Sequence, residues 1–206
     1  MPTERELKFT VDVERAPSDD ALLAAFEGAA MRLEARGTLT HADRYYDDPR
    51  LSLSRSGVAL RRRIGGGRIL ATLKTHGRVV GALHEREEIE LPMEGRAWPD
   101  PIRDRVARIT DPEALKGRFE LETARRRFMV HGPEGELAEL SIDQVEASRP
   151  TGGRSVRFAE IEIEDRGGGT ASLERIAARL AEFVDLRPSD ETKLEKARRL
   201  LLGAER

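Results

Sequence analysis

The sequence predicts an α+β protein whose core is built mainly by antiparallel β-strands. Short segments in which apolar and charged residues alternate recur along the chain, starting with ERELKFTV at residues 4–11. This period of two is typical of strands that bury one face. Two such segments flank the glycines at 65–67, as expected for a hairpin. Segments with helical periodicity stand apart from the strands, near the two ends of the chain.

In the first half of the chain, one predicted helix interrupts the strands. Residues 18–37 carry an apolar stripe at helical spacing, with Ser18 as the N-cap and Gly37 as the closing residue. The strand that follows runs into a turn ended by Pro49. The strands of this half are predicted at residues 4–11, 39–49, 58–75 (the hairpin) and 82–91.

In the second half, proline and glycine residues between 92 and 117 indicate one or two short helices. Residues 170–185 form an amphipathic helical pattern with Leu173 and Phe183 on its apolar side. Because the chain shows neither a linker nor a long-period repeat, a single domain over residues 1–206 is the simplest account. The other predicted elements are a hairpin over 119–147 that turns at 132–135, a strand over 156–165 and a helix over 190–202.

The composition excludes several classes of protein. The 36 Lys and Arg residues nearly cancel the 38 Asp and Glu residues, which argues against a generally basic nucleic-acid binder. The chain contains no cysteine, so disulfides, thiolate nucleophiles and cysteine-ligated zinc are excluded. No apolar run approaches the roughly 20 residues of a membrane span, and no signal peptide is visible. We therefore expect a cytoplasmic protein that binds neither nucleic acid nor membranes.

The predicted strands carry a second face that is densely charged. In the first strand, Glu4, Glu6 and Lys8 lie on one face, while Leu7 and Phe9 lie on the other. Exposure to water would explain this pattern, since antiparallel sheets commonly have one solvated side. Alternation places further charged residues on the same face of later strands: Arg61, Arg63, Lys74, Arg86, Glu88, Glu90, Arg125, Arg127, Asp143, Glu160, Glu162 and Glu164.

The clustering of like charges argues against a merely solvated surface. Glu160, Glu162 and Glu164 are neighbours on one face and repel one another unless a cation lies between them. Carboxylate clusters bind hard divalent cations, and arginine clusters bind phosphate. The two together are what a metal-assisted phosphoryl-transfer site requires.

Other motifs give weaker signals. The histidines at 41, 76, 84 and 131 lack metal-binding spacing, and we expect none of them to be a metal ligand. His84 shares the charged face with Arg86, so contact with a substrate is left open. Arg62 and Arg126 fall on the opposite face of their strands, and GGGR at 65–68 lacks the spacing of a P-loop.

The charged strands resemble the motifs of the CYTH superfamily, the triphosphate tunnel metalloenzymes. ERELK at 4–8 matches the ExExK signature, and YYDDP at 45–49 resembles the family's YYDTP, departing at Asp48. The match covers nearly the whole chain and is most similar to bacterial inorganic triphosphatases. The family's further motifs follow in order as ALRRR at 59–63, TLKT at 72–75, EREEIEL at 85–91, SIDQ at 141–144, EIEIE at 160–164 and SDETKLEKARRLL at 189–201.

The resemblance implies a closed antiparallel eight-stranded β-barrel that forms a tunnel, with the charged faces lining the lumen and helices packed outside. It also implies metal-dependent hydrolysis of inorganic triphosphate to pyrophosphate and phosphate. Mg²⁺ or Mn²⁺ is the expected cofactor, because the ligands are all oxygen atoms. The expected partner is triphosphate or another small molecule bearing a polyphosphate group, and a homodimer is left open.

By the same resemblance, Glu4, Glu6 and Lys8 are the expected catalytic residues. Pairing with a neighbouring glutamate is the alternative for Arg127, and a place on an exposed helix is the alternative for Lys193. The residues expected to bind phosphate are Lys8, Arg61, Arg63, Lys74, Arg86, Arg125, Arg127 and Lys193. The expected metal ligands are Glu4, Glu6, Glu88, Glu90, Asp143, Glu160, Glu162 and Glu164.

Other functions of the same fold stay open at this point. They are a class IV-type adenylate cyclase, a thiamine or nucleoside triphosphatase, and a non-catalytic polyphosphate-binding module. A cyclase needs a pocket for adenine and ribose, for which Tyr45, Tyr46 and Phe119 are the aromatic candidates. A binding module could lose its metal carboxylates, whereas both carboxylate clusters are present here, which favours catalysis.

Overall fold

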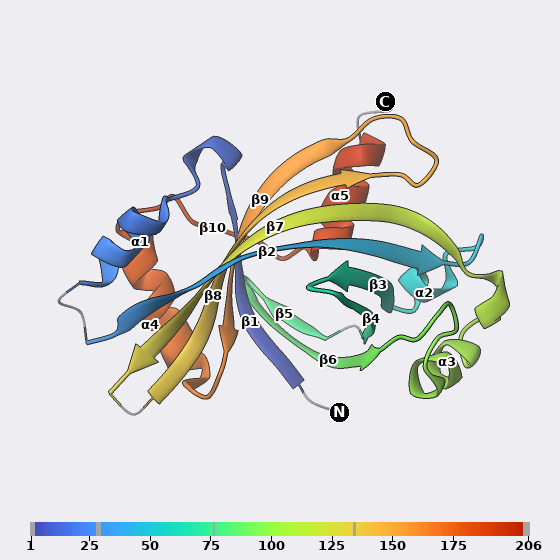
Figure 1. Ribbon diagram of the computed structural model, residues 1–206, viewed down its shortest axis with the longest axis horizontal. Coiled ribbons are helices and arrows are strands. Elements are labelled where there is room, and N and C mark those ends of the chain that lie inside the picture. The colour runs from blue at the N-terminus through green and yellow to red at the C-terminus, as the bar shows by residue number, and fades with distance from the viewer. Residues whose placement is uncertain (1–2, 28–29, 76, 134, 204–206) are drawn as a thin grey trace.

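The computed structural model describes residues 3–27, 30–75, 77–133 and 135–203. The barrel strands are β1 (Thr3–Val11), β2 (Arg32–Asp47), β3 (Ala59–Gly65), β4 (Arg68–Lys74), β6 (Leu83–Pro92), β7 (Lys116–Gly132), β8 (Gly135–Ser148) and β9 (Val156–Asp165). They are antiparallel and follow the order β1–β9–β8–β7–β2–β3–β4–β6, and β6 pairs back onto β1 (Figure 1). The predicted closed eight-stranded barrel is therefore confirmed. Two short strands pair with the barrel from outside the ring of eight. β5 (Arg78–Val80) pairs with β6, and β10 (Arg187–Pro188) pairs with β1.

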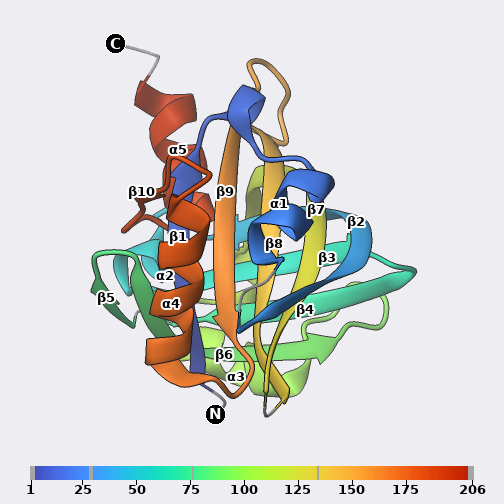
Figure 2. The ribbon, with the colours of Figure 1, turned by 90° about the vertical axis from the view of Figure 1, so that its left-hand side faces the viewer.

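Helices cover the outside of the barrel and one of its ends. They are α1 (Asp19–Phe26), α2 (Ser52–Arg55), α3 (Asp100–Ala107), α4 (Gly169–Ala181) and α5 (Lys193–Leu202), with the 3-10 turns η1 (Val13–Arg15) and η2 (Pro112–Ala114). α4 packs against β1, β8 and β9, with α1 beside it (Figure 2). α3 covers β4, and α5 contacts β7, β8 and β9. No helix in the described segments combines the length and apolar character needed to cross a membrane.

The apolar faces of the strands point outward, under the helices. Phe128, Leu140 and Ile161 are buried in a core that includes residues of α1 and α4. Leu60 and Leu73 are buried in a second core together with residues of α2 and α3. The alternation read from the sequence therefore sends the apolar residues to the outer side of the barrel and leaves the charged residues for the lumen.

A third apolar cluster lies on the inner side, where α5 covers one end of the barrel. Leu121 and Val145 share the parity of the charged residues on β7 and β8. Both pack in one cluster with Ala197 and Leu201 of α5. This contact fixes α5 against the lumen, and thereby fixes the residues at its first turn.

One predicted helix was wrong over much of its length. The helix expected over residues 18–37 ends at Phe26, and Arg32 begins β2. Gly37 does not end a helix. It lies where the β2–β7 register shifts, between Ala35 and Thr38, and its φ of 77° is a conformation that glycine adopts easily. Pairing with β7 satisfies the backbone of this segment and buries Leu33 in the outer core, so tertiary structure overrides the local helical pattern.

The helix ends show where local signals hold and where they fail. Ser18 caps α1 as predicted, because its hydroxyl accepts a hydrogen bond from the Ala21 amide. Phe183, predicted on the apolar side of a helix, instead lies beyond Ala181, the last residue of α4, and is 57% exposed. The guanidinium of Arg179 lies 5.0 Å from its ring centroid, which gives this exposed ring a cationic neighbour.

The outward-facing core leads to a stability prediction. Ile161 is completely buried, so Ile161→Ala should lower the free energy of unfolding by about 2–5 kcal/mol. Ile64→Ala is the matched control, because that side chain is 49% exposed; its cost should stay near about 0.5 kcal/mol. Urea unfolding measures both. Equal losses in the two variants would contradict the orientation of β9.

Candidate active site

The charged faces of the strands converge on a cavity of about 240 Å³ inside the barrel. Strand register explains this convergence, since Glu6 of β1 pairs with Glu164 of β9, and Glu4 pairs with Arg86 of β6. The predicted site residues that line the cavity are Glu4, Glu6, Lys8, Arg61, Arg63, Lys74, Arg86, Glu88, Glu90, Arg125, Glu162, Glu164 and Lys193.

The two glutamates of β1 are held by cations from three strands. Glu4 accepts hydrogen bonds from Lys74 Nζ and Arg86 Nε, both at 2.9 Å. Glu6 accepts one from Arg86 Nη2 at 2.8 Å and lies 3.3 Å from Lys8 Nζ. Burial opposes the ionisation of Glu4, but Lys74 and Arg86 outweigh it and hold the pKa of this carboxyl well below its ordinary value. Burial, with Arg86 nearby, lowers the pKa of Lys74.

A second group of ion pairs joins β1, β7, β8 and β9 to α5. Glu162 accepts hydrogen bonds from Lys8 at 2.8 Å and Arg125 at 2.5 Å, and also from Lys193. Asp143 receives both a two-pronged contact from Arg125, at 2.8 and 2.7 Å, and the Lys193 ammonium at 2.9 Å. Burial disfavours the ionised form of Glu162, yet Lys193 and Lys8 hold its pKa well below the ordinary range.

Lys193 reaches the tunnel because α5 starts at a defined residue. Thr192 and Glu195 form a capping box, in which each side chain accepts a hydrogen bond from the other's backbone amide. Lys193 is therefore the first residue of the helix and is buried. Burial alone would lower its pKa, but Asp143 and Glu162 raise it above the usual value. The alternative of an exposed helical lysine is thus excluded.

Asp43 is a tunnel carboxylate that sequence reasoning missed. It accepts hydrogen bonds from Arg63 Nε and Nη2, both at 2.7 Å, and from Arg61 Nη1 at 3.4 Å. Asp43 is 1% exposed, so these contacts are shielded from water. Alternation along the strand predicted over residues 39–49 could have indicated it. Asp43 lies on the same face as Tyr45, and Tyr45 lines the cavity.

The two aspartates of the YYDDP motif hold neighbouring segments at the end of β2 through hydrogen bonds. Asp47 accepts hydrogen bonds from the backbone amide and hydroxyl of Ser54, at 3.0 and 2.7 Å. Asp48, the position that departs from the family motif, accepts bonds from the hydroxyls of Ser52 at 2.7 Å and Thr110 at 2.6 Å. These bonds fix α2 and the segment after α3 beside the tunnel wall, and they lower the pKa of Asp48.

Negative charge is in excess at Glu164. Burial raises the pKa of its carboxyl to about 7. Arg166 Nη1 lies 2.9 Å away and offsets part of this rise, while the carboxylates of Glu4 and Glu6 add to it. Glu139 of β8 also faces Glu164 and lines the cavity; alternation places it on the same face of β8 as Asp143, but it is not among the predicted residues. This part of the wall is therefore suited to an additional cation.

Three predicted residues do not line the cavity. Asp143 and Glu160 are completely buried. Arg127 forms no ion pair within the described ranges, and its Nε is buried without a hydrogen-bond partner. The expected outward position of Arg126 is confirmed, because its guanidinium donates a hydrogen bond to Asp19, the first residue of α1, at 2.5 Å.

The histidines are scattered over the structure. His41 is buried near Arg63, and its pKa is lowered to about 4, chiefly by burial. His84 Nε2 lies 2.8 Å from the carbonyl oxygen of Ser189 and thus ties β6 to the segment before α5. His131 contacts a glutamate on the outer surface. His76 lies outside the described residues.

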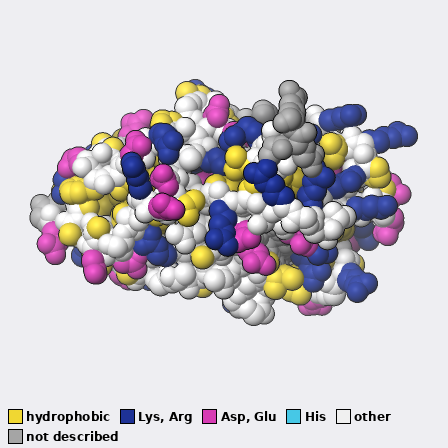
Figure 3. Space-filling view, turned by 90° about the horizontal axis from the view of Figure 1, so that it is seen from above, with side chains coloured by type: hydrophobic (Ala, Val, Ile, Leu, Met, Phe, Trp, Pro, Cys, Tyr) yellow, Lys and Arg dark blue, Asp and Glu magenta, His cyan; other side chains and the backbone are white. Residues whose placement is uncertain are grey.

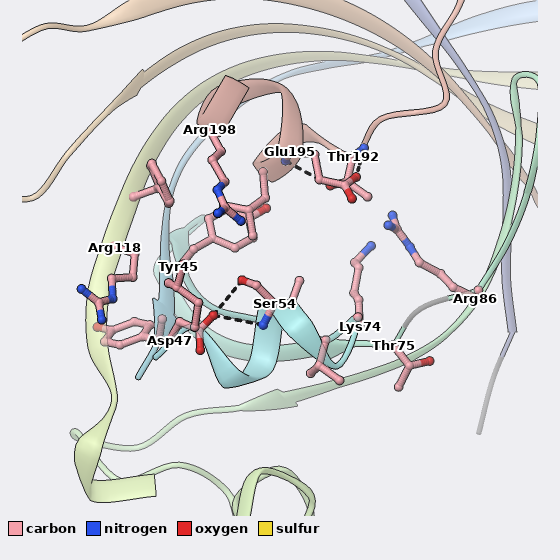
Figure 4. A pocket seen from close by; sticks show the side chains of 18 of the residues that line it. Tyr45, Asp47, Ser54, Lys74, Thr75, Arg86, Arg118, Thr192, Glu195 and Arg198 are labelled. Atoms are coloured by element: carbon pink, nitrogen blue, oxygen red, sulfur yellow. Dashed lines mark hydrogen bonds between the residues drawn. The ribbon is translucent and has the colours of Figure 1, made fainter. Parts of the chain in front are cut away.

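A larger cavity of about 940 Å³, which we call the vestibule, adjoins the tunnel. Figure 4 shows Lys74 and Arg86 pointing into the same open space, across from Thr192 at the start of α5. Phe119 and Leu202 also line the vestibule, so its wall is less polar than that of the tunnel. The residues that line both cavities are Tyr45, Ala59, Lys74, Arg86, Thr192 and Leu194.

The surface charge is unevenly distributed. Figure 3 shows Lys and Arg side chains gathered at the end of the molecule that carries α2 and α3 in Figure 1. A cationic end raises the local concentration of anions and accelerates their encounter with a nearby cavity.

The closed barrel with its charged lumen is the fold expected from the sequence motifs, and the sequence comparison agrees. The family model of the CYTH domain matches residues 2–197, and the chain belongs to this family. An uncharacterized protein of Mycobacterium tuberculosis strain H37Rv is 28% identical over 196 residues, which cover 86% of this chain and 36% of that protein. The chain thus spans about a third of the length of this curated relative.

Solved structures share the fold. A candidate adenylyl cyclase from Hippeastrum, which has a dominant triphosphatase activity, matches with a TM-score of 0.62 and 18% identity over 95% of both chains. A candidate adenylate cyclase from Bacillus halodurans matches with a TM-score of 0.56 and 16% identity, over 95% of this chain and 98% of that chain. A protein from Pyrococcus horikoshii gives 0.55 and 20%, over 98% and 99% of the two chains.

The raised pKa of Glu164 leads to a pH prediction. The folded protein keeps this proton up to about pH 7, while the unfolded chain releases it near 4.5, so raising the pH across this interval destabilises the protein. Glu164→Gln removes the titration. In EDTA, the unfolding free energy of the variant minus that of the parent should therefore rise between pH 4.5 and 7 and then level off. Urea unfolding at several pH values measures it, and a difference independent of pH would contradict the placement of Glu164.

Proposed function

We propose that this protein hydrolyses inorganic triphosphate to pyrophosphate and phosphate with the aid of a divalent metal ion. The observation that carries the proposal is the cavity of about 240 Å³, enclosed by the barrel and lined by both cations and carboxylates. Triphosphate is a compact and highly charged anion with no apolar surface, and such a lumen suits it in charge and polarity. Membership of the CYTH family supports the same choice.

The tunnel cations are proposed to bind the phosphate chain. Arg61 and Arg125 offer forked donors that can hold two phosphate oxygens each, while Lys74 supplies a compact charge. Because these residues stand on different strands and Lys193 stands on α5, the chain would be held from several sides of the barrel. The full proposed set is Lys8, Arg61, Arg63, Lys74, Arg86, Arg125 and Lys193 and, off the cavity surface, Arg127.

The carboxylates near Glu164 fit a hard divalent cation such as Mg²⁺ or Mn²⁺. Burial raises the pKa of Glu164 to about 7, and the carboxylates of Glu4 and Glu6 add to the rise, so a cation bound here would stabilise the ionised form. No three acidic or histidine side chains in the described part of the chain already surround a metal position. We propose Glu4, Glu6 and Glu164 as principal ligands, with Glu88, Glu90 and Glu162 in support. A bound metal neutralises phosphate charge and lowers the pKa of a water molecule.

The existing ion pairs couple the two binding events. Lys74 and Arg86 are engaged with Glu4, so a phosphate that takes these cations displaces its carboxylate. A buried carboxylate left without a cation costs several kcal/mol, on the order of 3–5. A divalent ion bound to the freed carboxylate offsets this cost. We therefore expect the substrate to bind as its metal complex.

Lys8 is proposed to organise the two carboxylate groups. Its ammonium lies 3.3 Å from Glu6 and 2.8 Å from Glu162, and the residue is 2% exposed. Burial would lower the pKa of Lys8, but Glu162 and Glu6 raise it, so the ammonium stays protonated. A fixed charge at this point orients Glu6 toward the metal position and attracts the phosphate chain.

A second candidate function is hydrolysis of a triphosphate that carries an organic group, such as a nucleoside or thiamine triphosphate. The vestibule favours it, because about 940 Å³ bordered by Tyr45 and Phe119 could hold an aromatic ring beside the tunnel. Cyclisation of ATP would use the same space. The Hippeastrum structure, with its dominant triphosphatase activity, supports hydrolysis as the first choice.

One assay separates these functions. Purified protein is incubated with tripolyphosphate, ATP or thiamine triphosphate in the presence of Mg²⁺ or Mn²⁺, and phosphate, pyrophosphate and cyclic AMP are followed. We expect the highest kcat/KM for tripolyphosphate. A preference for ATP or thiamine triphosphate would support the second candidate, cyclic AMP without phosphate would overturn hydrolysis, and tight binding without turnover would indicate a binding module.

The metal-ligand role of Glu6 is tested by Glu6→Gln. This change removes a ligand charge while keeping the side-chain volume, so kcat should fall about a hundredfold or more. Binding of triphosphate in EDTA should change far less, because that step uses the cations. Glu87→Gln on the exposed side of β6 is the control. Equal losses of turnover and metal-free binding would rule out a metal-ligand role.

The phosphate-binding role of Arg61 is tested by Arg61→Ala. The contacts of this guanidinium with Asp43, Glu90 and Glu88 are long, at 3.4, 3.7 and 3.8 Å, so a phosphate can replace them. Losing a charge-assisted contact of about 1.5–3 kcal/mol should raise KM roughly 10–100-fold, with a smaller change in kcat. Arg62→Ala, on the opposite face of β3, is the control. Steady-state kinetics decide, and an unchanged KM would remove Arg61 from the substrate site.

A further inference from the structure

A second buried lysine stands on α5, one turn after Lys193. Lys196 is 3% exposed, and its ammonium donates hydrogen bonds to Glu160 Oε1 and to Thr10 Oγ1, each at 2.6 Å. The same ammonium lies 5.6 Å from the ring centroid of Phe158. Lys196 lines neither the tunnel nor the vestibule.

Glu160 is enclosed by the two lysines of α5. It is 0% exposed, with Oε1 bound to Lys196 and Oε2 3.5 Å from Lys193 Nζ. Oε2 has no hydrogen-bond partner among the described residues. Glu162, two residues further along β9, does line the tunnel cavity, and so does Lys193, which contacts both glutamates. The two glutamates of one strand therefore have different surroundings.

We propose that Lys196 is a positioning residue that withholds Glu160 from the metal and fixes α5 so that Lys193 reaches the tunnel. This inference rests on the proposed metal-dependent hydrolysis and separates Glu160 from the ligands that the family resemblance implies. In this account Glu160 is the anchor of α5, and the metal is held on the other side of the lumen.

Electrostatics favour this division. The N-terminal turn of a helix carries a partial positive charge, and Lys193 and Lys196 add two more charges there. A divalent cation at Glu160 would face all of them at short range, in a region that excludes water. Near Glu164 the balance is reversed, because Glu6 and Glu139 pair with it on the neighbouring strands and Glu4 lines the same cavity. The α5 side of the tunnel thus suits phosphate, and the Glu4–Glu164 side suits the metal.

The anchor also explains how lysines are tolerated in the first turn of α5. Cations are unfavourable at a helix N-terminus. Glu160 compensates Lys196, and Asp143 and Glu162 compensate Lys193. Apolar contacts of Ala197 and neighbouring residues with the inner face of the barrel complete the attachment.

The test compares Glu160→Gln, Lys196→Met and the double variant with Glu6→Gln. Mn²⁺ affinity is measured from the electron paramagnetic resonance signal of free Mn²⁺, and thermal unfolding is followed in EDTA. We expect Glu160→Gln to change Mn²⁺ affinity less than about twofold, while Glu6→Gln weakens it at least about tenfold. Lys196→Met leaves Glu160 with the 3.5 Å contact to Lys193 but without its hydrogen-bonded ammonium, so Tm should fall by about 5 °C or more and Mn²⁺ should bind more tightly.

The double variant distinguishes the effect of an unpaired Glu160 from a general loss of folding. Glu160→Gln with Lys196→Met replaces the ion pair by neutral side chains of similar size, so Tm should recover and Mn²⁺ affinity should return to the parent value. Lys196→Arg should keep both properties near those of the parent. In Lys196→Met, a raised KM for triphosphate with a nearly unchanged kcat would show that Lys193 is misplaced.

Two results would overturn the inference. One is a loss of Mn²⁺ binding in Glu160→Gln as large as that in Glu6→Gln, which would make Glu160 a ligand and leave the proposed hydrolysis intact. The other is an unchanged Tm in Lys196→Met. A parent protein that does not hydrolyse triphosphate would overturn the proposed function instead, and the Mn²⁺ and stability measurements would still decide the role of Lys196, since neither needs turnover.

Discussion

Inside the barrel, lysine, arginine, aspartate and glutamate side chains pack against one another in a space that excludes most of the solvent. An isolated charge there would cost many kcal/mol, so the ion pairs of the lumen are what allow its side chains to stay ionised. Glu162, held by Lys8, Arg125 and Lys193, shows the arrangement most fully. The pairs join all eight barrel strands and α5, and they hold the first turn of α5 against the lumen.

The same pairing gives the tunnel its chemical character. Most of its cations are already bound by carboxylates, so an anion that takes one of them frees a carboxylate that then needs a cation. A triphosphate and a divalent metal together satisfy both demands, whereas either alone leaves charges uncompensated. Under the proposed function, this reciprocity makes the lumen selective for metal–phosphate complexes. It also assigns separate tasks to its two sides: the wall near α5 is richer in ammonium groups, and the wall near Glu164 is richer in carboxylates.

Much of this organisation could be predicted from the sequence because a strand has a strict period of two. Parity alone places Glu4, Glu6 and Lys8 on the same side as Arg61, and the barrel confirms it. Parity does not say how far a side chain is covered by another element. Glu160 has the same parity as its neighbours, but Lys196 of α5 encloses it, a contact 36 residues away in sequence.

Asp43 escaped selection because it stands alone in its strand, without a cluster to mark it. Residues 18–37 were assigned to one helix because Leu33 fits a helical stripe as well as the outer face of a strand. Only the pairing of β2 with β7 decides between these two structures, and that pairing is invisible in a local window. The most direct measurement of the account is a crystal structure with Mn²⁺ and a triphosphate analogue that cannot be hydrolysed. It should show the anion inside the barrel, with Lys74 and Arg86 turned from Glu4 to phosphate oxygens. An anion outside the barrel, with those ion pairs intact, would contradict it.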